Sequence, residues 1–124
     1  MSDATNALLV CATFPDLAQA RDIGRTLVNE RLAACVNVFG APLESIYTWK
    51  GQLEENAEIL VFIKTTRAEY PALEARLRAL HTYEVPEIIA VSIAAGLPAY
   101  LHWIVENCGP PVVRPGDETG DAPI

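Results

Sequence analysis

The chain is short of positive charge and of long apolar runs, and each shortage excludes a class of partner. Its 124 residues include nine basic and sixteen acidic residues, for a net charge of −7. A protein that neutralises nucleic-acid phosphates needs a basic face, so we expect no nucleic-acid partner. No segment approaches the roughly 20 apolar residues that span a bilayer, and no basic leader precedes the first apolar stretch. We therefore expect no membrane partner and a cytoplasmic location.

Cysteine and histidine are also scarce, which argues against a metal framework or a catalytic machinery. The three cysteines are Cys11, Cys35 and Cys108, and the two histidines are His81 and His102. An odd number of cysteines within apolar segments is typical of reduced, buried thiols, and no zinc-site spacing occurs. There is no nucleophile–base pairing, Gly-rich phosphate loop or dinucleotide fingerprint in the sequence. We expect a binding protein and not an enzyme.

The hydrophobic patterning predicts a single α+β domain over residues 1–108. Apolar and alternating runs predict strands, and stripes of period 3.6 predict amphipathic helices between them. The predicted order is strand 7–14, helix 15–32, strand 33–49, strand 52–66, helix 67–80, strand 85–93 and a third helix after Gly96. The β-α-β-β-α-β order is ferredoxin-like, with the C-terminal helix as an addition. Residues 109–124 are rich in Pro, Gly and Asp and are predicted to be a disordered tail.

Local signals refine several boundaries. Asp16 and Gln19 have capping-box spacing at the start of the first helix. Gly40 and Pro42 are expected to bend or bulge the strand 33–49, and a turn at residues 50–51 closes a long hairpin. The second helix has two possible starts, because Thr66 has capping-box spacing and Pro71 suits a first helical position.

Two misfits predict self-association. The runs at residues 7–11, 59–63 and 88–91 are apolar without alternation, although two helices can cover only one face of the sheet. Strands of about 15 residues also reach roughly 50 Å, whereas a compact chain of this length is about 35 Å across. The overhanging hairpin, with Ile46, Tyr47 and Trp49, would be unstable alone. An obligate oligomer, best closed as a ring, removes both misfits.

Five motif blocks then identify a resemblance to a known family. In chain order they are RLAACVNV, SIYTWKGQLEENAE, IKTT, LHTYEVPEIIAVSI and GLPAYLHWI. With these blocks, residues 8–106 resemble the CutA divalent-cation tolerance family. The resemblance implies a ferredoxin-like subunit, a homotrimer, and a link to copper and other divalent metals. The family signature usually reads His-Pro-Tyr, and here Thr82 replaces the proline.

His81 has two interpretations. It can cap carbonyls at the end of the second helix, or it can bind a metal through neutral imidazole. The resemblance implies the metal role, with copper or another divalent cation as a ligand that folding does not require. Leu80 occupies the place where copper-binding members often have a second histidine. Cys11 is one residue away from the position of the strand cysteine that some members have. A shift of one residue along a strand turns the side chain to the opposite face of the sheet.

A ligand cleft is expected where polar and aromatic residues end otherwise apolar segments. The predicted cleft residues are Trp49, Lys64, Tyr83 and Glu87, at a boundary between subunits. Glu84 and Glu87 would share a role only if the chain turns around Pro86. Glu54, Glu55 and Glu58 form an acidic patch near the hairpin, interpreted mainly as solvated charge.

Two alternatives remain open at the level of sequence. The first is a trimeric signalling module that resembles PII proteins and binds a small anion. The second is a hydrolase or isomerase that uses Glu84 or Glu87 in acid–base chemistry.

Overall fold

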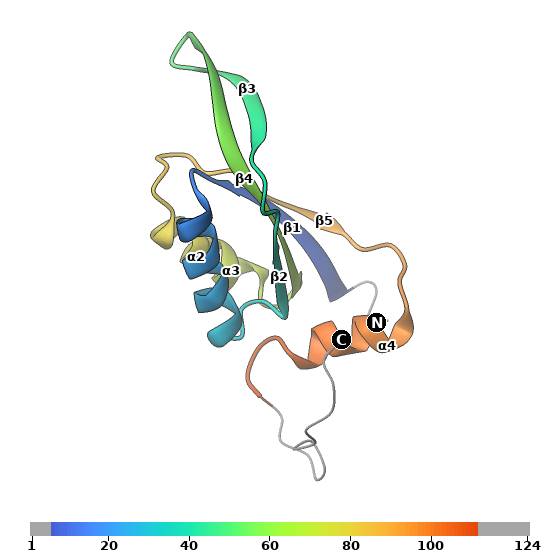
Figure 1. Cartoon of the computed structure of the whole chain (residues 1–124). Coiled ribbons are helices and arrows are strands. Elements are labelled where there is room, and N and C mark those ends of the chain that lie inside the picture. Colours follow the sequence, from blue (N-terminus) through green and yellow to red (C-terminus); the bar gives the residue numbers. More distant parts are fainter. Residues whose placement is uncertain (1–5, 112–124) are drawn as a thin grey trace.

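Five antiparallel strands and three helices make up the structure, a computed structural model that describes residues 6–111. Most of the predicted tail, residues 112–124, lies outside the described residues. In chain order the elements are β1 (Ala7–Phe14), α2 (Leu17–Asn29), β2 (Cys35–Val38), β3 (Leu43–Trp49), β4 (Gln52–Thr66), α3 (Tyr70–Leu80), β5 (Ile88–Ser92) and α4 (Pro98–Glu106) (Figure 1). No helix among these residues is long and apolar enough to cross a membrane.

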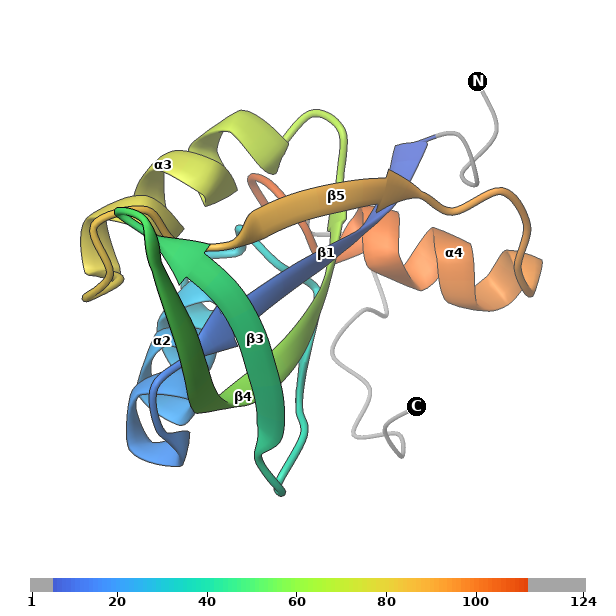
Figure 2. The same cartoon turned by 90° about the horizontal axis from the view of Figure 1, so that it is seen from above.

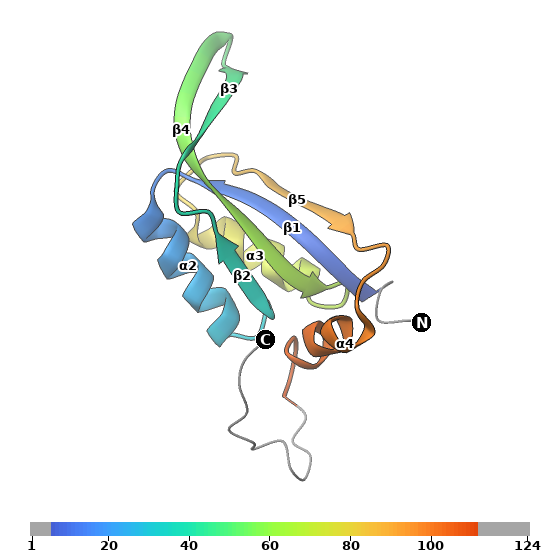
Figure 3. The same ribbon diagram turned by 45° about the vertical axis from the view of Figure 1, so that its right-hand side comes forward.

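The strand order confirms the predicted ferredoxin-like topology. The order across the sheet is β2-β4-β1-β5, and β3 pairs with the outer part of β4. Val10 on β1 lies opposite Ile63 on β4 and Ala90 on β5, so one register runs across the sheet centre. The helices α2 and α3 lie together on one face of the sheet (Figure 3).

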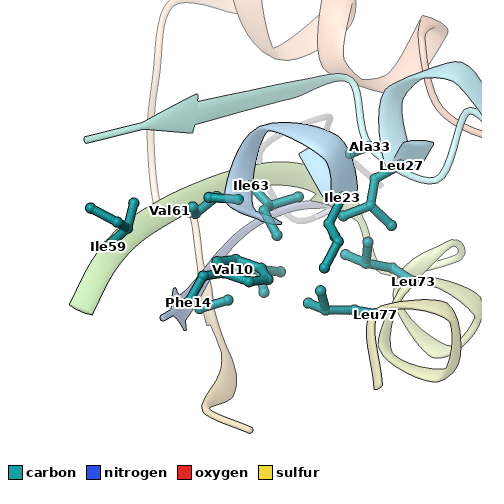
Figure 4. Close-up of a cluster of buried hydrophobic side chains, with 12 residues drawn as sticks. Val10, Phe14, Ile23, Leu27, Ala33, Ile59, Val61, Ile63, Leu73 and Leu77 are labelled. Carbon is teal, nitrogen blue, oxygen red and sulfur yellow. The ribbon is translucent and has the colours of Figure 1, made fainter. Parts of the chain in front are cut away.

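The main core fills the space between that face and the two helices. Side chains from alternate positions of β1 and β4 meet leucines and isoleucines of α2 and α3. Its largest fully buried members are Phe14, Leu27, Ile63, Leu73 and Leu77 (Figure 4). This packing places β1, and with it Phe14, firmly against α3, whose C-terminal end leads into the functional site.

The helix starts follow the capping signals. The Asp16 carboxylate accepts a hydrogen bond from the Gln19 backbone N–H at 2.8 Å, as predicted. Both signals at α3 contribute, because the helix begins at Tyr70 with Pro71 in its first turn, while the Thr66 hydroxyl accepts from the Glu69 N–H at 3.3 Å. Thr66 stabilises the turn before the helix and is not its N-cap.

Two strand predictions need correction. The predicted strand 33–49 is two strands, β2 and β3, because residues 39–42 interrupt the ladder where Gly40 and Pro42 were expected to bend it. The predicted strand 85–93 is shorter, and β5 begins at Ile88. Pro86 lacks the N–H that a ladder needs, so residues 83–85 form a bend and residues 86–87 lead irregularly into β5.

The second face of the sheet is apolar and mostly uncovered, as the sequence predicts. The helix α4 covers only one end of it, through a small cluster that includes Ala7, Leu101 and Ile104. Elsewhere Ile89 and Val91 are 54% and 50% exposed. We call this surface the open face, and its other apolar members are Leu9, Cys11, Phe39, Leu60 and Phe62.

The hairpin of β3 and β4 extends beyond the sheet as an arm (Figure 1), and Figure 2 shows this arm from above. Its two-residue turn has positive φ at both positions, 51° at Lys50 and 80° at Gly51. Such a turn matches the right-handed twist of the strands and pairs Trp49 directly with Gln52. The turn therefore determines which side chains share each face of the arm.

We predict that Gly51→Ala weakens the arm. A Cβ added at Gly51 meets no atom within 4 Å, so the substitution costs free energy only because alanine is unfavourable in the left-handed backbone conformation. That cost is about 1 kcal/mol, or roughly fivefold less protection of the β3–β4 amides in hydrogen exchange. Gly40→Ala is the matched control, because its added Cβ is equally free of contacts and its φ is ordinary. Equal protection in the two variants would contradict the assigned turn.

Candidate functional site

A cavity of about 760 Å³ lies between the arm and the segment that joins α3 to β5. We call residues 81–87 the corner. The arm supplies one wall and the corner the other, so segments some 30 residues apart in the chain meet here (Figure 1). The volume of the cavity is in the range typical of sites for small molecules.

The arm wall is one face of a two-stranded ribbon. Tyr47 and Trp49 on β3 share this face with Glu54, Asn56 and Glu58 on β4, because alternate residues point the same way and Tyr47 lies opposite Glu54. The Asn56 amide donates a hydrogen bond of 2.7 Å to the Tyr47 hydroxyl. The wall thus combines aromatic rings with carboxylates.

The corner wall is held in place by His81. This residue is the C-cap of α3, is 8% exposed, and its ring stacks on Phe14 with 4.7 Å between centroids. Nδ1 accepts a hydrogen bond from the Tyr83 backbone N–H at 3.0 Å, so the neutral ring carries its proton on Nε2. Nε2 donates to the Thr13 carbonyl at 2.7 Å. His81 therefore ties β1 to the corner and directs Tyr83 toward the cavity.

A hydrogen bond joins the two walls. The Tyr83 hydroxyl donates to the carboxylate of Glu58, which is only 7% exposed. Burial and the hydrogen bond to the Glu58 carboxylate raise the pKa of Tyr83 well above its ordinary value of about 10. Tyr83 therefore stays protonated and keeps donating throughout the physiological range.

An ammonium group of the chain itself lies beside the cavity. Lys50 Nζ is 5.7 Å from the centroid of the Trp49 ring and 3.8 Å from Glu84 Oε2. The contact combines a cation–π interaction with an exposed ion pair, and each is weak at a solvated site.

Three of the four predicted cleft residues meet in this cavity. Trp49, Tyr83 and Glu87 all line it. Lys64 is not among the residues of one chain that line it, so its place in a cleft between subunits stays a prediction. Its Nζ lies on the open face, where it donates to the Asn37 side chain and is 4.0 Å from Cys35 Sγ. Nine residues of β4 lie between Glu54 and Lys64, and Lys64 is not among the residues that line the cavity.

The sequence analysis missed some cavity residues. Glu84 and Glu87 both line the cavity, because the chain bends before β5 as the sequence argument required. Tyr47, Glu54 and Glu58 were not expected in the cleft. The turn at residues 50–51, combined with alternation, was the signal that could have placed all three on the face of Trp49.

The described residues contain no complete metal site. Within residues 6–111, no three His, Cys, Asp or Glu side chains lie close enough to hold one ion. Both ring nitrogens of His81 are occupied, so a metal would have to replace one of its hydrogen bonds. The assignment of His81 as a metal ligand stays a prediction.

The three thiols are free, and two of them are only partly buried. Cys108 is buried, whereas Cys11 and Cys35 lie half-buried on the open face. Burial, with a smaller contribution from the charge of Glu87, raises the pKa of Cys11. Of the three cysteines predicted to be buried thiols, Cys108 is therefore the one that fits this prediction best.

Comparison with protein families gives a match to one model across nearly all of the described chain. Residues 8–107 match the model for the CutA1 divalent ion tolerance protein. The chain is 48% identical to the divalent-cation tolerance protein CutA of Thermus thermophilus over 101 residues, which cover 82% of this chain and 97% of that protein. It is 47% identical to mouse protein CutA over 92 residues, or 74% of this chain and 51% of the mouse protein.

Solved structures agree with this match. The Thermus thermophilus protein superposes with a TM-score of 0.80 and covers 83% of this chain and 99% of its own. A protein from Archaeoglobus fulgidus, described as a periplasmic divalent cation tolerance protein, has a TM-score of 0.78 at 34% identity over 82% of this chain and 97% of its own.

We predict that His81→Ala destabilises the fold, whether or not a metal binds. The change removes two hydrogen bonds and the stacking on Phe14, and it should lower the free energy of unfolding by about 2–4 kcal/mol. His102→Ala is the control, because that exposed histidine pairs with Glu106 one turn away on α4, and the loss of such an exposed pair should cost about 0.5 kcal/mol or less. Urea denaturation measures both, and equal losses would contradict the structural role of His81.

Proposed function

The chain belongs to the CutA1 divalent ion tolerance protein family, and from this premise we propose that it is a homotrimeric, non-catalytic binding protein in divalent-cation tolerance. Copper is the cation we propose first. The observation that carries the proposal is the open face, since a single chain leaves Ile89 and Val91 half exposed beside other apolar residues. Monomeric proteins rarely expose an apolar patch of this kind.

Assembly as a closed ring accounts for the other exposed features. The strands β2 and β5 are the two edges of the sheet, and each presents unpaired backbone groups. The arm also exposes Ile46 and Leu53, at 62% and 67%, at positions that alternate with Tyr47 and Glu54, and Ile46 also reaches the edge of the cavity. A ring of three subunits, the form that the family resemblance implies, would cover the open face and pair these edges.

We place metal binding between subunits. One described chain supplies no complete set of ligands, so a second chain must contribute. Lys64 lies on the open face, away from Trp49, Tyr83 and Glu87, and can join them only from a neighbouring chain. The proposed site is thus a cleft between subunits, with His81 as the candidate ligand near its inner wall.

We also propose a cytoplasmic location. Support comes from the three thiols, none of which is in a disulfide among the described residues. Reduced thiols are usual where glutathione and thioredoxin act. The periplasmic description of the Archaeoglobus fulgidus relative makes location a property to test for each member, by fractionating cells that express the untagged chain.

We predict that the wild-type chain sediments as a trimer at micromolar concentration and that Ile89→Glu dissociates it. A carboxylate on the open face would be buried without a partner, which costs several kcal/mol per subunit. Val28→Glu is the control, because Val28 is also partly exposed, at 39%, but lies on α2 away from the open face. Analytical ultracentrifugation gives the answer, and a stably folded wild-type monomer would overturn the assembly.

We predict that the trimer binds Cu²⁺, and that His81→Ala weakens binding at least tenfold relative to wild type and to His102→Ala. Isothermal titration with Cu²⁺ and Zn²⁺ measures this, on variants that sedimentation shows to be assembled. Wild-type protein that binds neither ion at micromolar concentration would reject the metal proposal. Equal affinity in wild type and His81→Ala would reject His81 as a ligand and leave the metal proposal to other residues.

A further inference from the structure

The cavity between the arm and the corner has a strongly acidic lining. Four glutamates line it, and no lysine, arginine or histidine is among the described residues that do so. Glu58 is almost fully buried, and its carboxylate accepts a hydrogen bond from the neutral hydroxyl of Tyr83. Glu58 is the lining carboxylate that is removed from water, whereas Glu84 and Glu87 are exposed, and a buried carboxylate favours a cation beside it. The part of the cavity that one chain builds therefore favours positive charge, which either a ligand or the Lys64 that we propose comes from a neighbouring subunit can supply.

The carboxylates are spread out and do not converge. Within the described residues no three acidic, cysteine or histidine side chains could hold one metal ion, although Glu54, Glu58, Glu84 and Glu87 share one cavity. A compact ion could satisfy only part of such a lining. A longer cation with charges at both ends fits separated carboxylates better, and about 760 Å³ accommodates it.

Aromatic rings give the cavity a second means to bind organic cations. Tyr47, Trp49 and Tyr83 line it together with the carboxylates. Aromatic faces attract ammonium groups, and Trp does so most strongly. Rings also contact methylene chains, which a bare metal ion lacks. This combination distinguishes an alkylammonium ligand from an inorganic cation.

The chain's own lysine shows that one end of the cavity accepts an alkylammonium group. Lys50 Nζ lies near the Trp49 ring and Glu84, at 5.7 Å from the ring centroid and 3.8 Å from the carboxylate oxygen. The Lys50 side chain is 71% exposed, so the contact is weak and can be exchanged. A ligand ammonium would replace Lys50 at this place.

We propose that the cavity binds a linear aliphatic diamine or polyamine. One ammonium lies by Trp49 and Glu84 in place of Lys50, the methylene chain lies along the aromatic wall, and the other ammonium meets the carboxylates at Glu58 and Glu54. Binding requires neither a metal nor His81 as a ligand. The inference therefore goes beyond metal tolerance and is tested separately.

The test is isothermal titration of the assembled, metal-free wild-type protein with 1,5-diaminopentane and spermidine. We expect both to bind, and pentan-1-amine and 1,5-pentanediol to bind at least tenfold more weakly, because they lack one or both charges. Affinity should fall as salt rises. A diamine that binds no tighter than the monoamine would overturn the proposal. So would the absence of binding by any amine, which is also the result expected if a neighbouring subunit already fills the cavity.

Paired variants locate the site. Glu58→Gln and Trp49→Leu should each weaken diamine binding about tenfold, whereas Glu55→Gln, on the opposite face of β4, should leave it unchanged. Lys50→Met removes the internal competitor and should tighten binding severalfold beyond Arg78→Met, which removes an exposed positive charge on α3. The proposed site would be overturned if the cavity variants and Glu55→Gln had equal effects, or if Lys50→Met and Arg78→Met had equal effects.

Parallel Cu²⁺ titrations separate this inference from the proposed function. Diamine binding without metal binding supports the cavity assignment and rejects only the metal proposal. Metal binding without diamine binding rejects only the cavity assignment.

Discussion

A sheet that is apolar on both faces, with helices on only one of them, is the constraint from which the rest of this structure follows. The centre of the sheet, β1 between β4 and β5, has apolar side chains at almost every position. The helices α2 and α3 bury one set of these in the main core. The other set, including Phe62, Ile89 and Val91, faces outward, and α4 covers only its end. Burial of that second set is the main free energy available for self-association.

The same long strand that crosses the sheet centre also builds the cavity. The inner part of β4 supplies the core, and its outer part pairs with β3 and leaves the sheet as the arm. Rigidity of the inner part, through Ile59 and Ile63, therefore positions the carboxylates of the outer part. His81 does the same for the opposite wall, because its stacking on Phe14 anchors the corner to β1. Core packing and the ligand cavity are thus mechanically connected.

Chemistry in the cavity follows from which groups share it and which do not. Aromatic rings on β3 lie beside carboxylates on β4 in the arm wall, and Tyr83 of the corner reaches Glu58. Lys64, the cation that would have balanced part of this charge, lies on the open face with Asn37. The single chain therefore separates an acidic, aromatic cavity from an apolar surface with one lysine. These two regions suit different occupants, a cation in the first and another subunit on the second.

The sequence alone determined the features that depend on local periodicity and on backbone chemistry. Apolar runs, the Asp16 cap and the break at Gly40 and Pro42 act over a few residues, so the element order and the uncovered face could be inferred without coordinates. Only the tertiary structure decided what faces what across long separations. It brought Glu58 to Tyr83, directed the two ring nitrogens of His81 to β1 and to the corner, and left Lys64 outside the cavity that Glu87 lines. Such contacts depend on the register and twist of strands distant in sequence, which no local pattern encodes.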